Sequence, residues 1–152
     1  MSASHTATTG KTLMIVEDEV IVAMELRQVL TEAGYHVLDL TDRHAEALAV
    51  AKASKPDLAL VNIRLAGRDD GIELAEHLKA LGIPVVFISG QSSRAHSATT
   101  VAIASMPKPY DAANMVLAVD YLLRGLEGDH SGPVPDGLEV FDDGGFDVAP
   151  AA

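Results

Sequence analysis

The chain has 152 residues, no cysteine and a formal net charge of −11 at pH 7. Its length predicts one domain, and a hydrophobic content of 48% is enough to build a buried core. The lack of cysteine excludes disulfides and thiolate catalysis and favours a cytoplasmic location. No apolar run is long enough to cross a bilayer, and residues 1–12 lack the basic and apolar regions of a signal peptide, so no membrane contact is expected.

The negative charge is concentrated near the C-terminus. Residues 125–152 carry seven acidic side chains and neither lysine nor arginine, whereas the rest has 15 acidic and 11 basic side chains. Nucleic-acid binding is not expected, because neutralising phosphates requires a basic patch. The composition predicts a flexible N-terminus over residues 1–10, a domain over 11–125 and an acidic flexible tail over 126–152. The tail's Phe141 and Phe146, with Leu138 and Val140, leave a short docking segment open as the alternative to an unstructured extension.

The first half of the chain alternates short apolar runs with longer amphipathic ones. The pattern predicts, in order, a strand over 13–16, a helix over 20–33, a strand over 36–40 and a helix over 43–54. Gly34 is the stop signal of the first helix. Asp42 is expected to cap the second helix, and Pro56 prevents that helix from continuing.

The same alternation continues in the second half. It predicts a strand over 58–62, a helix over 71–81, strands over 84–89 and 101–106, and a helix over 111–124. Asp70 is expected to cap the helix that follows it. Between Gly90 and Thr100 the chain is rich in serine and threonine and has almost no apolar stripe. The fourth helix of the alternation is therefore expected to be short or missing.

Strands that alternate with helices and are apolar throughout predict an α/β fold, in which helices cover both faces of a doubly wound five-stranded parallel sheet. Polar groups at the carboxyl ends of such strands meet in one crevice. Five polar residues have this position, and together they are called the rim: Glu17, Asp18, Asn62, Ser89 and Lys108. Carboxylates can hold a hard cation such as Mg²⁺, while an ammonium and a hydroxyl can meet phosphoryl oxygens.

Taken together, these motifs resemble the receiver domains of two-component response regulators, which have a CheY-like (flavodoxin-like) fold, over about residues 11–125. The matching stretches are 14–19 (MIVEDE), 56–67 (PDLALVNIRLAG), 70–74 (DGIEL), 88–90 (ISG) and 106–110 (MPKPY). The resemblance implies signal transduction in a phosphorelay rather than catalysis of a metabolic reaction. It also implies a histidine kinase or another phosphorelay protein as the partner.

The resemblance assigns roles to the rim. Glu17 and Asp18 would form the acidic pair that holds Mg²⁺, and the backbone carbonyl of Arg64 would be a further ligand beside residue 62. Ser89 and Lys108 would contact the phosphoryl group. The bond between Lys108 and the proline after it would be cis. A receiver often has an aromatic switch residue three positions before this lysine, but serine stands there in this chain.

The main departure is at the phospho-acceptor position, which holds Asn62 instead of aspartate. A carboxamide is not a useful nucleophile and cannot form an acyl phosphate. Neither Asp57, at the start of the strand, nor Asp69 and Asp70, in a loop, is oriented to replace the missing carboxylate. At about 4 Å and an effective dielectric of 20, each lost attraction to a cation is about 4 kcal/mol before solvent offsets it. We therefore expect Mg²⁺ binding to be weak or absent, and Lys108 to pair with Asp18 or Glu17.

Three functions remain compatible with the sequence. The first is a single-domain receiver that regulates by docking and is not phosphorylated. The second is an ordinary phospho-accepting receiver in which Asn62 was introduced to trap the unphosphorylated state. The third is an enzyme on the same fold, either a phosphatase or a nucleotide-binding protein, although the chain has no catalytic residue that identifies it. The apolar last helix also leaves a homodimer open.

Overall fold

The computed structural model of the chain describes residues 8–65, 70–90 and 98–141. Over these residues the elements are β1 (Thr12–Val16), α1 (Val20–Glu32), β2 (His36–Val37), α2 (His44–Ser54), β3 (Leu58–Asn62), α3 (Gly71–Ala80), β4 (Val85–Ser89), β5 (Ala104–Pro107), α5 (Ala112–Leu126) and β6 (Glu139–Val140). In the same part of the chain, no helix is both long and apolar enough to span a membrane.

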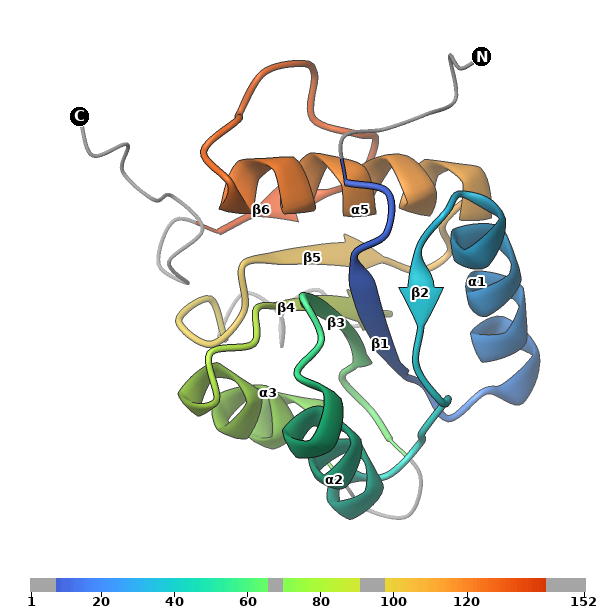
Figure 1. Cartoon of the computed structure of the whole chain (residues 1–152), viewed down its shortest axis with the longest axis vertical. Coiled ribbons are helices and arrows are strands. Elements are labelled where there is room, and N and C mark those ends of the chain that lie inside the picture. The colour runs from blue at the N-terminus through green and yellow to red at the C-terminus, as the bar shows by residue number, and fades with distance from the viewer. Residues whose placement is uncertain (1–7, 66–69, 91–97, 142–152) are drawn as a thin grey trace.

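The strands form one sheet with the order β2-β1-β3-β4-β5-β6 (Figure 1). The first five strands are parallel to their neighbours, and β6 pairs with β5 in the antiparallel sense. The α/β, doubly wound, CheY-like fold predicted from the sequence is confirmed. The sheet differs from the prediction by its sixth strand.

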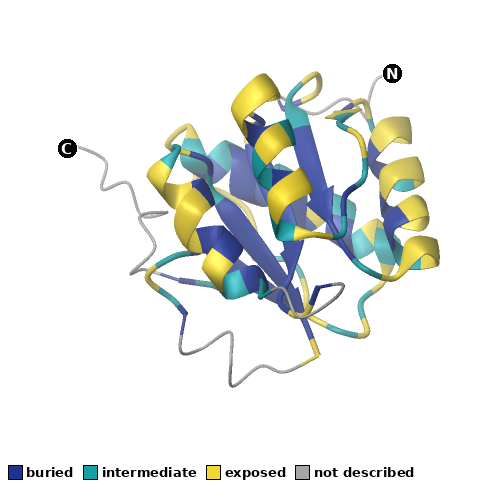
Figure 2. Cartoon of the chain, turned by 90° about the horizontal axis from the view of Figure 1, so that it is seen from below, coloured by how far each residue is buried: buried dark blue, intermediate teal, exposed yellow. Residues whose placement is uncertain are grey.

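Alternating side chains of the central strands pack into two hydrophobic clusters, one on each face of the sheet. In β1, Leu13 and Ile15 belong to a buried cluster shared with α1 and α5. Met14 and Val16 point the other way, into a cluster shared with α2 and α3. A strand that is buried on both faces has no need of polar residues, which is why these strands are apolar throughout. Figure 2 shows the buried strands between helices whose outer faces are exposed.

Two helix-capping predictions had different outcomes. The Asp70 side chain accepts a hydrogen bond from the backbone N–H of Ile72 at 2.8 Å, so this cap is confirmed. The prediction for α2 is wrong, because the residue at the cap position is Arg43 and no side chain caps the helix. Asp42 lies one residue too early to accept a hydrogen bond from the first turn.

The region between β4 and β5 is described only in part. Residues 91–97, over which a short or missing fourth helix was predicted, lie outside the described residues. The next residues, 98–101, form a turn, and β5 begins at Ala104 instead of residue 101. The second strand is also shorter than the predicted 36–40, since it contains only His36 and Val37.

The N-terminus is anchored from Thr8 onward, which corrects the prediction of a flexible segment over 1–10; residues 1–7 lie outside the described residues. Thr8 is fully buried. Its hydroxyl lies 2.6 Å from the Tyr35 hydroxyl and donates to Oδ1 of Asp120 in α5 at 2.8 Å. These buried hydrogen bonds hold the start of the domain against α5.

The predicted flexible tail is wrong for residues 126–141. Leu126 is the last residue of α5, and the chain then returns to the sheet as β6. Leu138 and Phe141 are 8% and 3% exposed, each in one of the two core clusters. Because these side chains pack within their own domain, the segment is part of the fold. Residues 142–152 lie outside the described residues.

Candidate functional site at the strand ends

The structure brings all five rim residues together at the carboxyl ends of β1, β3, β4 and β5. Four of them line one cleft of about 410 Å³, and Glu17 lies beneath it with 3% of its surface exposed. The residues that line the cleft are Asp18, Glu19, Asn62, Ile63, Arg64, Ser89, Gly90 and Lys108. This is where an open parallel sheet is expected to bind a ligand.

The side-chain amide of Asn62 points toward oxygen atoms from two neighbouring segments. Its Nδ2 donates to Oδ1 of Asp18 at 2.9 Å and to Oε2 of Glu17 at 3.3 Å. It also donates to the backbone carbonyl of Arg64 at 2.5 Å. These three acceptors belong to the residues that the family resemblance assigns to a cation. The amide nitrogen therefore occupies the point on which the three oxygens converge.

The neighbours of Asn62 determine which end of its amide faces them. An amide NH₂ group has two donors and the amide oxygen has none. If Oδ1 faced Glu17 and Asp18, an oxygen would lie against two carboxylates, and all three acceptors would lose the amide donor, with Oε2 of Glu17 keeping only the Glu19 N–H. The observed orientation satisfies all of them at once, with one N–H shared between two acceptors.

The present arrangement does not fit Mg²⁺. That ion requires oxygen ligands at about 2.0–2.1 Å in octahedral geometry. Here the oxygens of Glu17, Asp18 and Arg64 surround two amide hydrogens, which would face any cation placed between them. Across the described ranges, no group of three or more histidine, cysteine or acidic side chains is placed to hold a metal.

Glu17 is a buried carboxylate with a divided environment. Its Oε2 accepts from the Asn62 amide and from the backbone N–H of Glu19 at 3.1 Å. Its Oε1 is buried without a hydrogen-bond partner and lies 3.5 Å from Nζ of Lys108. Burial raises the pKa of Glu17, against the opposing effects of the Glu19 N–H and the Lys108 ammonium.

Lys108 is held by groups from two strand ends. Its ammonium lies 3.0 Å from Oε1 of Glu19 and 3.5 Å from Oε1 of Glu17. Its backbone N–H donates to the carbonyl of Ser89 at 2.9 Å, and the bond to Pro109 is cis. The predicted partners were Asp18 or Glu17, so one is observed and Glu19 is the second. Glu19 is the third acidic residue in a row after β1, and this run was the sequence signal that could have predicted its ion pair with Lys108.

Gly71 is a second residue whose importance the sequence pattern does not reveal. It begins α3, and its N–H donates to the carbonyl of Ile63 at 2.7 Å. A Cβ atom at this position would lie 2.1 Å from the backbone oxygen of Asn62, a distance no side chain can adopt. Glycine therefore lets α3 start against the end of β3, which fixes the backbone around Asn62.

The chain matches known proteins over the part that carries this site. The family model for the response regulator receiver domain matches residues 13–120. The Mycobacterium tuberculosis protein PdtaR, a transcriptional regulatory protein, is 28% identical over 118 residues, covering 75% of this chain and 57% of PdtaR. The phyllosphere-induced regulator PhyR of Methylorubrum extorquens is 30% identical over 114 residues, covering 73% and 43%. The chain thus spans about half the length of these relatives.

Solved structures show the same fold. The response regulator PhyR from Brucella abortus superposes with a TM-score of 0.71 at 28% identity, covering 82% of this chain and 51% of PhyR. A CheY-like receiver domain protein from Methanospirillum hungatei gives a TM-score of 0.70 at 25% identity, covering 79% and 98%.

Proposed function

Because this chain belongs to the response regulator receiver domain family, we propose that it is a receiver that acts by docking to other signalling proteins and does not accept a phosphoryl group. The observation that carries this proposal is the Asn62 amide at the centre of the rim. An acyl phosphate needs a carboxylate nucleophile, and the amide nitrogen is already engaged as a donor.

The contacts of the rim support a single fixed state. Asn62 joins the end of β3 to Glu17 and Asp18, and Lys108 joins the segment after β5 to Glu17 and Glu19. Hydrogen bonds to charged groups contribute about 1.5–3 kcal/mol each, so together they oppose rearrangement of the strand ends. A receiver that stays in one state can regulate a partner by binding it stoichiometrically.

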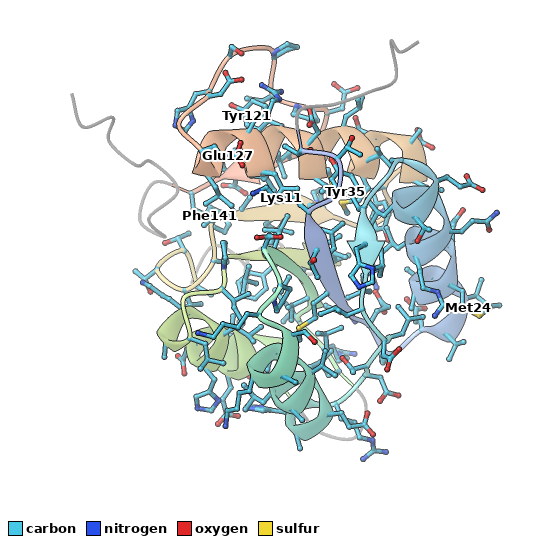
Figure 3. All side chains as sticks on the ribbon, viewed as in Figure 1. Lys11, Met24, Tyr35, Tyr121, Glu127 and Phe141 are labelled. Atoms are coloured by element: carbon cyan, nitrogen blue, oxygen red, sulfur yellow. The ribbon has the colours of Figure 1, made fainter. Side chains whose placement is uncertain are left out.

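A docking surface lies directly beside the rim. The first turns of α1 expose three apolar side chains, with Val20 65%, Ile21 82% and Met24 51% exposed. Figure 3 shows Met24 directed away from the domain. A groove lined by Ile21, Met24 and polar residues continues along the helix. Exposed apolar side chains at helical spacing suit a helical partner, which supports a histidine kinase or another phosphorelay protein as the ligand.

One observation favours the ordinary receiver with an introduced Asn62 as the second candidate. Ser89 and Lys108 line the same cleft as Asn62, and the bond after Lys108 is cis, which supports a site that lacks only the carboxylate. If the rest of the site is competent, changing Asn62→Asp restores phosphorylation in a single step.

The first test is intact mass after incubation with Mg²⁺ and a small phosphodonor. We expect no change in the mass of the wild-type chain. A gain of one phosphoryl group by the wild type would overturn the proposal. A gain by Asn62→Asp alone would show that the site differs from a phospho-accepting one by this amide.

The second test addresses docking. Wild-type chain and an Ile21→Lys variant are used to capture partners from extract of the source cells, and bound proteins are identified by mass spectrometry. We expect the wild type to retain a histidine kinase or phosphorelay protein and Ile21→Lys to lose it. The matched control is Leu117→Lys, because Leu117 is also exposed (60%) but lies on α5. Equal capture by both variants would contradict docking through α1.

A further inference from the structure

The segment of residues 127–141, called here the C-terminal segment, closes one edge of the sheet. In the ladder between β5 and β6, Val140 lies opposite Ala104 and Glu139 lies opposite Ser105. The N–H of Phe141 then donates to the carbonyl of Ile103 at 2.8 Å. The backbone groups that β5 presents at the edge are thus met by residues of the same chain.

The side chains of the C-terminal segment enter the core on both faces of the sheet. Leu138 is 8% exposed and belongs to the cluster shared with α1 and α5, against which Val140 also packs. Phe141, which is labelled in Figure 3, is 3% exposed. It belongs to the opposite cluster, which includes Ala98 and Ala102. The edge of β5 therefore offers one apolar slot on each face as well as a backbone template.

The attachment of β6 is short. Its ladder contains two residue pairs, and the turn before it is fixed by Asn114, whose Nδ2 donates to the carbonyl of Asp136 at 2.6 Å. Between α5 and this turn the chain is mostly exposed and contains two glycines in the left-handed region, Gly128 and Gly132. This connection can let β6 leave the edge without disturbing the parallel strands.

We propose that the edge of β5 is a binding site for an extended peptide, and that β6 is its resident ligand, supplied by the chain itself. An unpaired edge strand recognises a peptide through its backbone, and side-chain slots provide the specificity. The partner that fits is a strand with apolar residues at the positions of Leu138, Val140 and Phe141. Such a partner competes with β6 for the same edge.

The competition has a measurable consequence. While β6 is bound, the site is available only in the small fraction of molecules in which the edge is open, and the apparent affinity for an external peptide falls by that fraction. Weakening β6 in its own chain must then raise the affinity for the peptide. This effect is independent of Asn62 and of phosphorylation.

The experiment compares the wild-type chain with the full-length double variant Leu138→Asp, Phe141→Asp. The probe is a synthetic peptide of residues 127–141, and binding is measured by calorimetry and by amide hydrogen exchange of β5. We expect the double variant to bind the peptide at least tenfold more tightly than the wild type and to regain protection at β5. The same peptide carrying both aspartates should not bind.

Two further variants complete the experiment: a milder substitution and a matched control. Phe141→Ala is the milder form to use if the double variant does not fold, and it should also bind more tightly than the wild type. Val134→Asp is the matched control, because Val134 lies in the connection and is 48% exposed; it should behave like the wild type. A folded Phe141→Ala or double variant without increased affinity would overturn the proposal.

Discussion

The rim and the edge of β5 are two places where a group of the chain itself stands where a ligand could bind, but the two groups are attached differently. At the rim the group is one side chain, Asn62, which is 6% exposed at the end of a central strand. At the edge it is β6, which pairs over two residues and follows a connection of 12 residues after α5. The amide belongs to a buried residue of a central strand, whereas β6 lies at the edge and, in our proposal, separates from β5 while the remaining sheet stays paired.

This difference indicates where the protein can respond. A buried donor with three acceptors favours one state of the strand ends. A short edge strand opens at a lower free energy than the core, because local openings begin where few contacts are made. Regulation by a partner is therefore expected at the exposed face of α1 and at the edge of β5 that β6 covers, and not at the rim.

The largest effect is expected for Asn62→Ala, because it removes the donor from the rim. The oxygens of Glu17, Asp18 and Arg64 would lose the hydrogen bonds from the amide, and two carboxylates would face each other without it. We expect the free energy of unfolding to fall by about 3–5 kcal/mol, as measured by urea denaturation without divalent cations. The control is Gln28→Ala, whose amide donates to the exposed Oε2 of Glu32 at 3.2 Å on the surface of α1. A loss below about 1 kcal/mol for Asn62→Ala would mean that the amide does not hold the rim.

Gly71→Ala tests whether the rim depends on the close approach of α3 to β3. The added methyl group would meet backbone atoms of Asn62 and Ile63, which cannot move independently of the sheet. We expect a loss of about 2–3 kcal/mol in the free energy of unfolding. Gly90→Ala is the matched control, since a Cβ there meets nothing within 4 Å among the described residues, and its effect should be within about 0.5 kcal/mol. Equal losses for both variants would contradict the packing argument.

Phe141→Ala measures how tightly the edge is closed. The phenyl group is buried, but it sits at the edge, where the surrounding structure can relax. We expect a loss of about 2 kcal/mol in the free energy of unfolding, below the roughly 3–5 kcal/mol that is typical of a fully buried aromatic residue. Hydrogen exchange should show that protection is lost at β5 and β6 and kept at β1 and β3. A uniform loss over the whole sheet would mean that β6 opens only with the domain.

The smallest effect is expected from the titration of Glu17. Since burial raises the pKa of Glu17 in the folded chain, the unfolded chain releases its proton at lower pH. The stability of the wild type relative to Glu17→Gln should therefore decrease as the pH rises above about 4.5 and become constant above the folded pKa. Urea denaturation of both chains between pH 4 and about 8 measures this difference. An increase with pH would mean that the ammonium of Lys108 outweighs burial.

The parallel sheet and the rim could be predicted because they depend on local patterns. Apolar strands alternate with helices, and the ends of parallel strands must meet, so Glu17, Asn62 and Lys108 had to be neighbours. The role of β6 could not be predicted in this way. Its segment is acidic and rich in glycine and proline, and its few apolar residues become meaningful only when β5 is in place.

The orientation of the Asn62 side-chain amide also could not be predicted from the sequence. The sequence showed that an amide replaces a carboxylate, but either end of the amide could have faced the acidic pair. The choice depends on three acceptors, one of which is a backbone carbonyl two residues further along the chain. Similarly, Asp42 is a residue type that often caps helices, but it lies one residue before the cap position. Only the observed start of α2 at His44 reveals this.

The most direct test is a calorimetric titration of Mg²⁺ into the wild type, Asn62→Ala and Asn62→Asp. If the amide hydrogens occupy the position between the oxygens, removing the amide should improve binding even though a polar residue is lost. We expect Asn62→Asp to bind most tightly, Asn62→Ala less tightly and the wild type most weakly. Tighter binding by the wild type than by Asn62→Ala would show that Asn62 acts as a ligand through its oxygen, and would contradict the account of the rim.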